Sequence, residues 1–241
     1  MVVPNVFGPF GKPNYNSFIA TFCYKLSHGE DPQVLVDNDV ELIYVGELVD
    51  EILQIIERNE TRERYEIKAT SFCKVTEILK KLQYFKAQYF DQGIIPNLES
   101  ELDYQLFNTF RCYFDIDKHY PVKLVQNVDD RGAFVEVIRL GIGGQCSFST
   151  TKPGITRGNH FHTRKIERFA VISGKALIQL RKIGTDEVLD FYLDGNEPAY
   201  VDMPIWYTHN IKNIGTEELY TIFWINEPYD PNNADTFFET V

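Results

Sequence analysis

The chain has 241 residues, which fits one large domain or two small ones and is long enough to bury a proper core. Hydrophobic residues make up 44% and charged residues 24%, as in an ordinary soluble globular protein. The formal net charge is −11, and an acidic surface repels phosphate backbones, so nucleic-acid binding is not expected as the main activity. The charge does not exclude a small anionic ligand, because such a ligand needs only a few cationic side chains nearby.

The cysteines show no metal-binding or disulfide pattern. The four of them are far apart in the sequence, and no CxxC pair occurs. This spacing indicates buried thiols in a reducing compartment. No run approaches the roughly 20 apolar residues that span a bilayer, and the first residues lack a basic n-region and a cleavage site. We therefore expect a cytoplasmic protein with no membrane partner.

The two halves of the chain differ in their pattern of apolar and turn residues. In the first half, apolar residues recur at helical spacing, and short strand-like pieces lie between the helices. The predicted helices cover 16–26, 47–58, 75–85 and 99–114, and the strand-like pieces 33–36 and 42–45. After about Lys118, short β-rich runs alternate with turn residues, which predicts a sandwich or barrel. The predicted strands cover 122–125, 133–140, 169–172, 176–181, 188–192, 199–201 and 220–225.

Residues 154–174 carry the most informative pattern. His160 and His162 are two apart, so on a strand both project from the same face and can share one metal ion. Glu167 follows after room for a turn and supplies a carboxylate from the adjoining strand. His209 lies far along the chain, so only folding could bring it close. The alternative is a set of ordinary core or surface histidines, which is the interpretation favoured for His28 and His119.

These spacings resemble the cupin superfamily. Its first motif is G, five residues, HxH, three or four residues, E, six residues, G, and residues 154–174 match every fixed position. Its second motif is PxG, two residues, H, three residues, N. The matching residues are Pro204, His209 and Asn213, while Trp206 replaces the glycine. Three imidazoles and one carboxylate suit zinc, iron, manganese, nickel or copper, which the sequence does not separate; zinc is the metal we expect.

A closer resemblance covers the whole chain. The runs at 149–160, 223–231 and 235–239 are similar to the C-terminal domain of CapF-type capsular polysaccharide synthesis enzymes. Residues 4–9 and 40–49 look like the later part of an extended short-chain dehydrogenase/reductase. The resemblance implies an α+β chain with two domains. Residues 1–117 would be a mainly helical remnant of a Rossmann-like reductase domain, and residues 118–241 an all-β cupin, a jelly-roll barrel.

The first half shows neither a GxxGxxG phosphate loop nor a YxxxK pair where that reductase family carries them. We therefore expect no NAD(P) binding and no reductase activity from this chain alone. A split or internally started reading frame would explain the pattern, and a separately encoded reductase fragment is then a candidate partner. Cupins often dimerise, and a homodimer is expected.

The resemblance implies a sugar-nucleotide epimerase that acts at C3 of a UDP-2-acetamido-2,6-dideoxy-4-hexulose. A ketone at C4 acidifies the C3 proton, and a metal or cation stabilises the charge that develops on the C4 oxygen. Lys165 and Tyr207 are our candidates for proton transfer, and Arg157 for the diphosphate. Arg131 belongs to a DRG run shared with dTDP-4-dehydrorhamnose-type epimerases and is a second candidate for substrate binding.

Other interpretations stay open. Four protein ligands also suit a purely structural metal, because structural sites are closed and catalytic sites keep one position open. The chain could bind a sugar nucleotide or dimerise without doing chemistry. A cupin dioxygenase is the third alternative, and it would need redox-active iron and access for oxygen.

Overall fold

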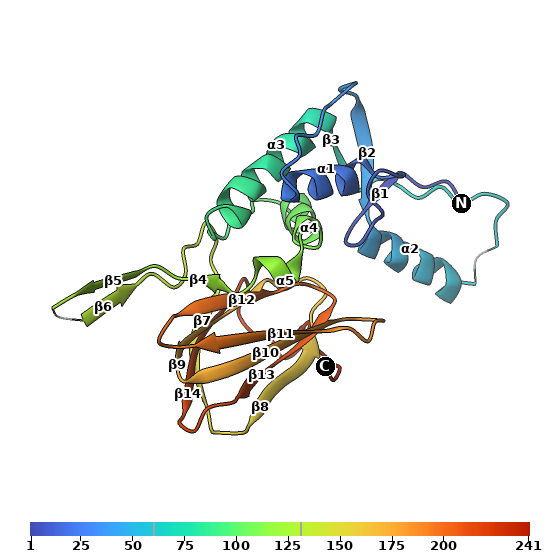
Figure 1. Cartoon of the computed structure of the whole chain (residues 1–241). Coiled ribbons are helices and arrows are strands. Elements are labelled where there is room, and N and C mark those ends of the chain that lie inside the picture. The colour runs from blue at the N-terminus through green and yellow to red at the C-terminus, as the bar shows by residue number, and fades with distance from the viewer. Residues whose placement is uncertain (60, 131) are drawn as a thin grey trace. The chain divides into compact units, whose positions relative to one another are not determined.

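A computed structural model of the chain describes residues 1–59, 61–130 and 132–241. The chain forms two compact units: Met1–Gln92 with Leu98–Phe114, and Gly93–Asn97 with Asp115–Val241. In the described part of the chain, no helix is both long and apolar enough to cross a bilayer. Figure 1 labels the elements of both units.

The first unit combines a small sheet with helices. Its elements are β1 (Asn5–Phe7), α1 (Phe18–Ser27), β2 (Asp39–Tyr44), α2 (Val45–Glu57), β3 (Ser71–Lys74), α3 (Val75–Phe85), the π-helix η1 (Lys86–Phe90) and α4 (Glu101–Phe110). The sheet has the order β1-β2-β3; β1 and β2 are parallel, and β2 and β3 are antiparallel. The predicted helices therefore exist, and the strand-like piece at 42–45 lies at the end of β2.

Side-chain caps explain where these helices begin. Ser17 precedes α1, and its hydroxyl accepts a hydrogen bond from the Ala20 amide at 3.3 Å. Ser100 and Asp103 form a capping box at α4: the Ser100 hydroxyl accepts from the Asp103 amide, and the Asp103 carboxylate accepts from the Ser100 amide. The helix predicted over 99–114 is therefore shorter than expected, because the cap fixes its start at 101 and it ends at 110.

Helix α2 has an apolar face that this unit leaves uncovered. None of its residues is buried, although its sequence is strongly amphipathic. Val49, Leu53 and Ile56 are 47%, 50% and 65% exposed. By contrast α3 buries Ile78, Leu82 and Phe85. The same helical periodicity therefore marks a packed helix at α3 and an exposed apolar stripe at α2.

The second unit is all-β apart from the short helix α5 (Ile116–His119). Its strands are β4 (Val122–Lys123), β5 (Gln126–Asp129), β6 (Gly132–Val135), β7 (Gln145–Thr151), β8 (Thr156–Phe161), β9 (Glu167–Ser173), β10 (Lys175–Lys182), β11 (Val188–Asp194), β12 (Ala199–Met203), β13 (Tyr207–Asn213), β14 (Leu219–Ile225) and β15 (Phe237–Phe238). The predicted all-β character of this half is confirmed.

Two antiparallel five-stranded sheets face each other in this unit (Figure 1), and β5 pairs with β6 in a separate hairpin. The strand orders are β11-β10-β13-β8-β15 and β4-β12-β9-β14-β7. From β8 to β14 the chain crosses repeatedly between the two sheets, which is how a jelly-roll barrel closes its edges. Strand β10 shows the expected period of two, because Ala176, Ile178 and Leu180 are buried and alternate with more exposed residues.

One strand prediction was wrong, and two were wrong in part. Residues 33–36 form no strand, because this segment has no pairing partner among the described residues, and Leu35 is 93% exposed. The strands predicted over 122–125 and 133–140 end at Lys123 and Val135. In the last two cases β-prone residues continue beyond the point at which the strand loses its pairing partner.

Candidate metal centre

A β-bulge shapes the strand that carries the first histidine. Strand β8 pairs with β13, with His160 opposite His209 and Gly158 opposite Asn210, so Asn159 is the extra residue. A Cβ atom on Gly158 would lie 2.8 Å from the His209 carbonyl oxygen, and its φ is +102°. Gly158 therefore permits the close approach of the two backbones beside His209 and Asn210.

The four predicted metal ligands come together at one end of the barrel. His160 lies on β8, His162 directly after it, Glu167 at the first position of β9, and His209 on β13. One donor atom from each side chain lies within 4.8 Å of the other three. The Glu167 Oε2 atom is 3.1 Å from His162 Nε2 and 3.3 Å from His209 Nε2. The long-range pairing of β8 with β13 thus brings His209 to residues almost fifty positions earlier.

Backbone carbonyls orient two of the imidazole rings. His162 Nδ1 is 2.5 Å from the Asp235 carbonyl oxygen, and His209 Nδ1 is 3.3 Å from the Tyr207 carbonyl oxygen. A carbonyl oxygen only accepts, so both Nδ1 atoms carry the proton. The Nε2 atoms of both rings then face Glu167, which is the arrangement of metal-ligating histidines held by outer partners.

The electrostatics of the cluster favour a neutral His160 beside an ionised Glu167. Burial, together with the neighbouring His209 and His162, lowers the pKa of His160 to about 4. Burial alone would raise the pKa of Glu167, but the hydrogen bond with His162 and the close His209 ring outweigh it and hold that pKa well below its usual range. Burial would likewise lower the pKa of His162, but the hydrogen bond and charge of Glu167 raise it. A proton on His162 is therefore the one that a metal ion has to displace.

The residues present fit a divalent metal ion. His209 Nε2 is buried and has no hydrogen-bond partner among the described residues, although it points toward Glu167. A buried nitrogen in that state costs free energy unless a cation accepts its lone pair. Three imidazole nitrogens and one carboxylate are a donor set for zinc or another first-row metal.

A cavity of about 240 Å³ opens beside the cluster. Its lining is Ser149, Arg157, Gly158, His160, Glu167, Phe169, Met203, His209, Asn210, Ile211 and Phe223. The Phe169 and Phe223 rings stack 5.4 Å apart and give it an apolar wall. Arg157 provides a positive charge, and its guanidinium also donates to the Thr150 carbonyl oxygen at 3.3 Å. Three metal-ligand candidates therefore face a space with one apolar and one cationic side.

The other predicted site residues lie elsewhere. Lys165 is buried, and its ammonium donates to the Ala234 carbonyl oxygen at 2.5 Å; it is not among the described residues that line the cavity. Tyr207 is half-buried on β13 and is likewise not among the described residues of that lining. Their roles in proton transfer stay a prediction. Arg131, the second candidate for substrate binding, lies outside the described residues.

Trp206 explains the departure from the second motif. It has a φ of +62°, the left-handed region in which a glycine is usual. Its ring stacks on Phe161 at 5.7 Å, and its amide donates to the His162 carbonyl oxygen at 2.8 Å. The tryptophan therefore takes the backbone shape of the glycine that it replaces and supports the end of β8.

Sequence reasoning missed Ser149, Asn210 and Asp235. Ser149 and Asn210 line the cavity from β7 and β13, two strands that the sequence pattern did not predict. The signal for Asn210 was its place next to His209, but strand alternation alone would have turned it away from the cavity. Asp235 acts through backbone contacts, which have no sequence signature.

Comparison with known proteins finds relatives that are named for polysaccharide biosynthesis or assembly. Residues 127–237 match the family described as polysaccharide biosynthesis C-terminal domain. The chain is 41% identical to the capsular polysaccharide assembling protein CapF from Staphylococcus aureus, over 99% of this chain and 65% of that one, with a TM-score of 0.51. For the same protein in another crystal form, 70% of that chain is covered, with a TM-score of 0.50.

Two curated proteins are also similar. One is the UDP-2-acetamido-2,6-beta-L-arabino-hexul-4-ose reductase of Pseudomonas aeruginosa, with 30% identity over 98% of this chain and 63% of that protein. The other is the spore coat polysaccharide biosynthesis protein SpsL of Bacillus subtilis, with 27% identity over 47% of this chain and 82% of that protein. The chain thus spans a little under two thirds of the reductase.

Proposed function

We propose, since this chain belongs to the family of the capsular polysaccharide assembling protein CapF, that it is a metal-dependent sugar-nucleotide epimerase. The family assignment predicted from the sequence motifs is confirmed by 41% identity over 99% of the chain. The proposal itself rests above all on one observation: four buried donor groups converge beside a cavity of about 240 Å³.

The substrate that we propose is a UDP-2-acetamido-2,6-dideoxy-4-hexulose, with inversion at C3. The reductase relative is named for a substrate of this kind, a UDP-linked hexul-4-ose. The cavity is slightly smaller than the roughly 300–1,000 Å³ of pockets that enclose whole drug-sized ligands. The sugar ring would therefore occupy the cavity, while the nucleotide extends outside it.

The metal ion would be held by His160, His162, Glu167 and His209 and would supply positive charge near the C4 carbonyl. The stacked Phe169 and Phe223 rings exclude water from the same space, which strengthens electrostatic interactions there. A base removes the C3 proton, negative charge develops on the C4 oxygen, and a proton returns to the opposite face of C3. We propose that Arg157, which lines the cavity, binds the diphosphate through its charge.

Lys165 and Tyr207 stay our candidates for proton transfer, with zinc as the expected metal. The buried position of the Lys165 ammonium, bonded to a carbonyl oxygen, makes Tyr207 the first to test. Tyr207→Phe should lower the exchange rate at C3 while the metal content stays the same. An unchanged rate in both Tyr207→Phe and Lys165→Met would remove both residues from the mechanism.

For the first unit we propose the substrate-binding part of a Rossmann-like reductase. The parallel strands β1 and β2 are joined through α1, which is the connection typical of α/β folds. The homodimer also stays a proposal, and light scattering of the purified chain tests it. A mass of one chain, 28.0 kDa, would contradict the dimer.

The proposed activity is tested by deuterium incorporation at C3 of the UDP-4-keto sugar in heavy water, followed by proton NMR. We expect incorporation with the metal-loaded chain and its loss after treatment with a chelator. Incorporation that survives verified metal removal would leave an epimerase whose metal is dispensable for the reaction. Tight binding of the sugar nucleotide without incorporation would favour a non-catalytic binding module.

A further inference from the structure

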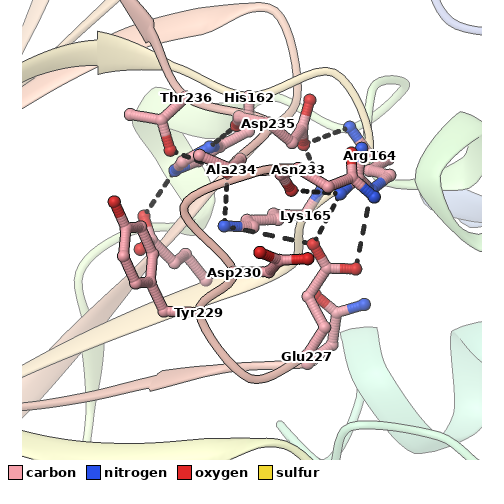
Figure 2. Close-up of polar contacts among 12 residues, drawn as sticks. His162, Arg164, Lys165, Glu227, Tyr229, Asp230, Asn233, Ala234, Asp235 and Thr236 are labelled. Carbon is pink, nitrogen blue, oxygen red and sulfur yellow. Dashed lines mark hydrogen bonds and ion pairs between the residues drawn. The ribbon is translucent and has the colours of Figure 1, made fainter.

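The segment between β14 and β15 lies against the turn that follows β8, as Figure 2 shows. Asp235, near the end of this segment, is 7% exposed and has a φ of +42°, although it is not a glycine. A side chain in the left-handed region costs free energy, and such residues persist where the surroundings hold them firmly. The contacts of Asp235 identify what holds it.

The carboxylate of Asp235 accepts hydrogen bonds from three consecutive backbone amides. Oδ1 accepts from the Thr163 amide at 3.1 Å and from its hydroxyl at 2.6 Å. Oδ2 accepts from the amides of Arg164 and Lys165, each at 3.0 Å. One buried side chain therefore satisfies three consecutive amide donors of the turn between β8 and β9, and the next amide, that of Ile166, donates to the Asn226 side chain. That turn connects two of the four metal-ligand candidates, His162 and Glu167.

The backbone carbonyl of the same residue accepts the Nδ1 proton of His162. This bond fixes which ring nitrogen carries the proton and turns Nε2 toward Glu167, at 3.1 Å. Asp235 thus reaches the site by two routes: its side chain sets the path of the turn, and its carbonyl sets the tautomer and orientation of the ring.

Two cationic side chains of the turn also hydrogen-bond to the segment that contains Asp235. The Lys165 ammonium donates to the Ala234 carbonyl oxygen, and the Arg164 guanidinium donates to the Asn233 carbonyl oxygen at 2.9 Å and to Glu227 at 3.0 Å. The two carbonyl acceptors belong to the residues directly before Asp235, so Lys165 helps to hold the segment against the turn.

We propose that Asp235 is a positioning residue of the metal centre, which presents His162 Nε2 to the ion. The inference rests on the proposed metal site. Without the carboxylate, the turn loses its acceptor and the Asp235 carbonyl moves away from Nδ1. His162 then binds the ion in a less favourable orientation, although all four ligands are still present.

The test compares Asp235→Asn with Asp230→Asn in the full chain. Asp230 lies in the same segment, and its carboxylate accepts from the Asn232 amide at 2.9 Å, away from the turn. In Asp235→Asn an NH₂ group faces backbone donors, so the turn is perturbed. We expect its affinity for Zn²⁺, measured by competition with a chromophoric chelator, to fall about 10–100-fold, as is typical for outer partners of metal ligands. Asp230→Asn should bind as the wild type does.

The Co²⁺-loaded proteins give a readout that lost stability alone would not change. The d–d absorption bands report the ligand geometry, and they should shift in Asp235→Asn and not in Asp230→Asn. If Asp235→Asn does not fold, Thr163→Val removes only the 2.6 Å hydroxyl contact to Asp235. Thr236→Val, which removes a bond to the Ala234 carbonyl oxygen at 2.9 Å, is its matched control. Thr163→Val should show a smaller shift of the same kind.

The outcomes separate this inference from the proposed function. If the wild type binds Zn²⁺ and Asp235→Asn binds it equally well with an unchanged Co²⁺ spectrum, the positioning role is wrong and the metal site stands. If the wild type binds neither ion, the metal site is wrong and the positioning role falls with it.

Discussion

Two neighbouring residues of β9, Glu167 and Arg168, are both buried charges, yet they belong to clusters of opposite character. The Arg168 guanidinium donates to both carboxylate oxygens of Asp202 at 2.7 and 2.9 Å and to the Gly93 carbonyl oxygen at 2.7 Å. It also lies 3.7 Å from the Tyr200 ring centre. Glu167, on the other face of the strand, is surrounded by three imidazoles, and His209 Nε2 there has no hydrogen-bond partner among the described residues.

This difference separates a structural cluster from a binding cluster. A buried ion pair that is bidentate and fully hydrogen-bonded needs nothing more, and it holds β9 to β12. A carboxylate with three surrounding ring nitrogens and an unsatisfied lone pair is suited to a cation. Strand alternation places these two kinds of charge back to back within two residues. Substitutions on the two faces should therefore affect different properties.

The largest effect is expected from Arg168→Met. It leaves Asp202 buried without its partner, which typically costs about 3–5 kcal/mol of unfolding free energy. Urea unfolding of the metal-free chain measures it. Arg139→Met removes an exposed pair with Glu136 and should leave the unfolding midpoint nearly unchanged. Equal midpoints for the two variants would show that the Arg168 cluster does not stabilise the fold.

Glu167→Gln should have the opposite profile. It removes the only carboxylate of the proposed metal site, so Zn²⁺ affinity should fall more than about 100-fold, beyond the usual loss for an outer partner. The unfolding free energy of the metal-free chain should change far less than in Arg168→Met. Competition titration measures the affinity, and Glu197→Gln, at an exposed glutamate paired with Lys123, is the control. Full affinity in Glu167→Gln would remove Glu167 from the site.

The pH dependence of metal binding should reveal the proton on His162. Glu167 raises the pKa of His162, so below that pKa the metal ion has to displace a proton. Apparent affinity should therefore rise about tenfold per pH unit with increasing pH and level off above the pKa of His162. His160, with a pKa of about 4, is already neutral in this range. Titrations between about pH 5 and pH 8 measure the slope. A flat profile would contradict protonation of the metal-free cluster.

The smallest effect is expected from Trp206→Gly. Glycine relieves the left-handed backbone by about 1–2 kcal/mol, while loss of the stack on Phe161 costs about 0.5–1.5 kcal/mol. The two nearly cancel, and Zn²⁺ affinity should stay within a few-fold of the wild type. Thermal unfolding measures the change in stability, and the chelator titration measures the Zn²⁺ affinity. A large loss of affinity would show that the indole ring itself supports the metal centre.

The sequence predicted the four donors of the candidate site because their spacing is local or belongs to a fixed motif. It predicted α3 and β10 because both have a clear period. It could not predict the bulge at Asn159, because this depends on pairing with a strand fifty residues away. Asp235 and the Arg168–Asp202 pair were also missed. The Arg168–Asp202 contact depends on the pairing of β9 with β12, and the contacts of Asp235 join segments about seventy residues apart. Helix α2 was predicted correctly, but its periodicity could not show that the first unit leaves its apolar face exposed.

The most direct test is the metal content of the chain after reconstitution with Zn²⁺ and gel filtration, measured by mass spectrometry for the wild type, Glu167→Gln and Glu197→Gln. If Glu167 is a metal ligand, the wild type and Glu197→Gln should each hold one metal ion per chain, and Glu167→Gln should hold close to none. A wild-type chain that retains no metal, or a Glu167→Gln chain that retains a full equivalent, would contradict the assignment of this cluster as a metal centre.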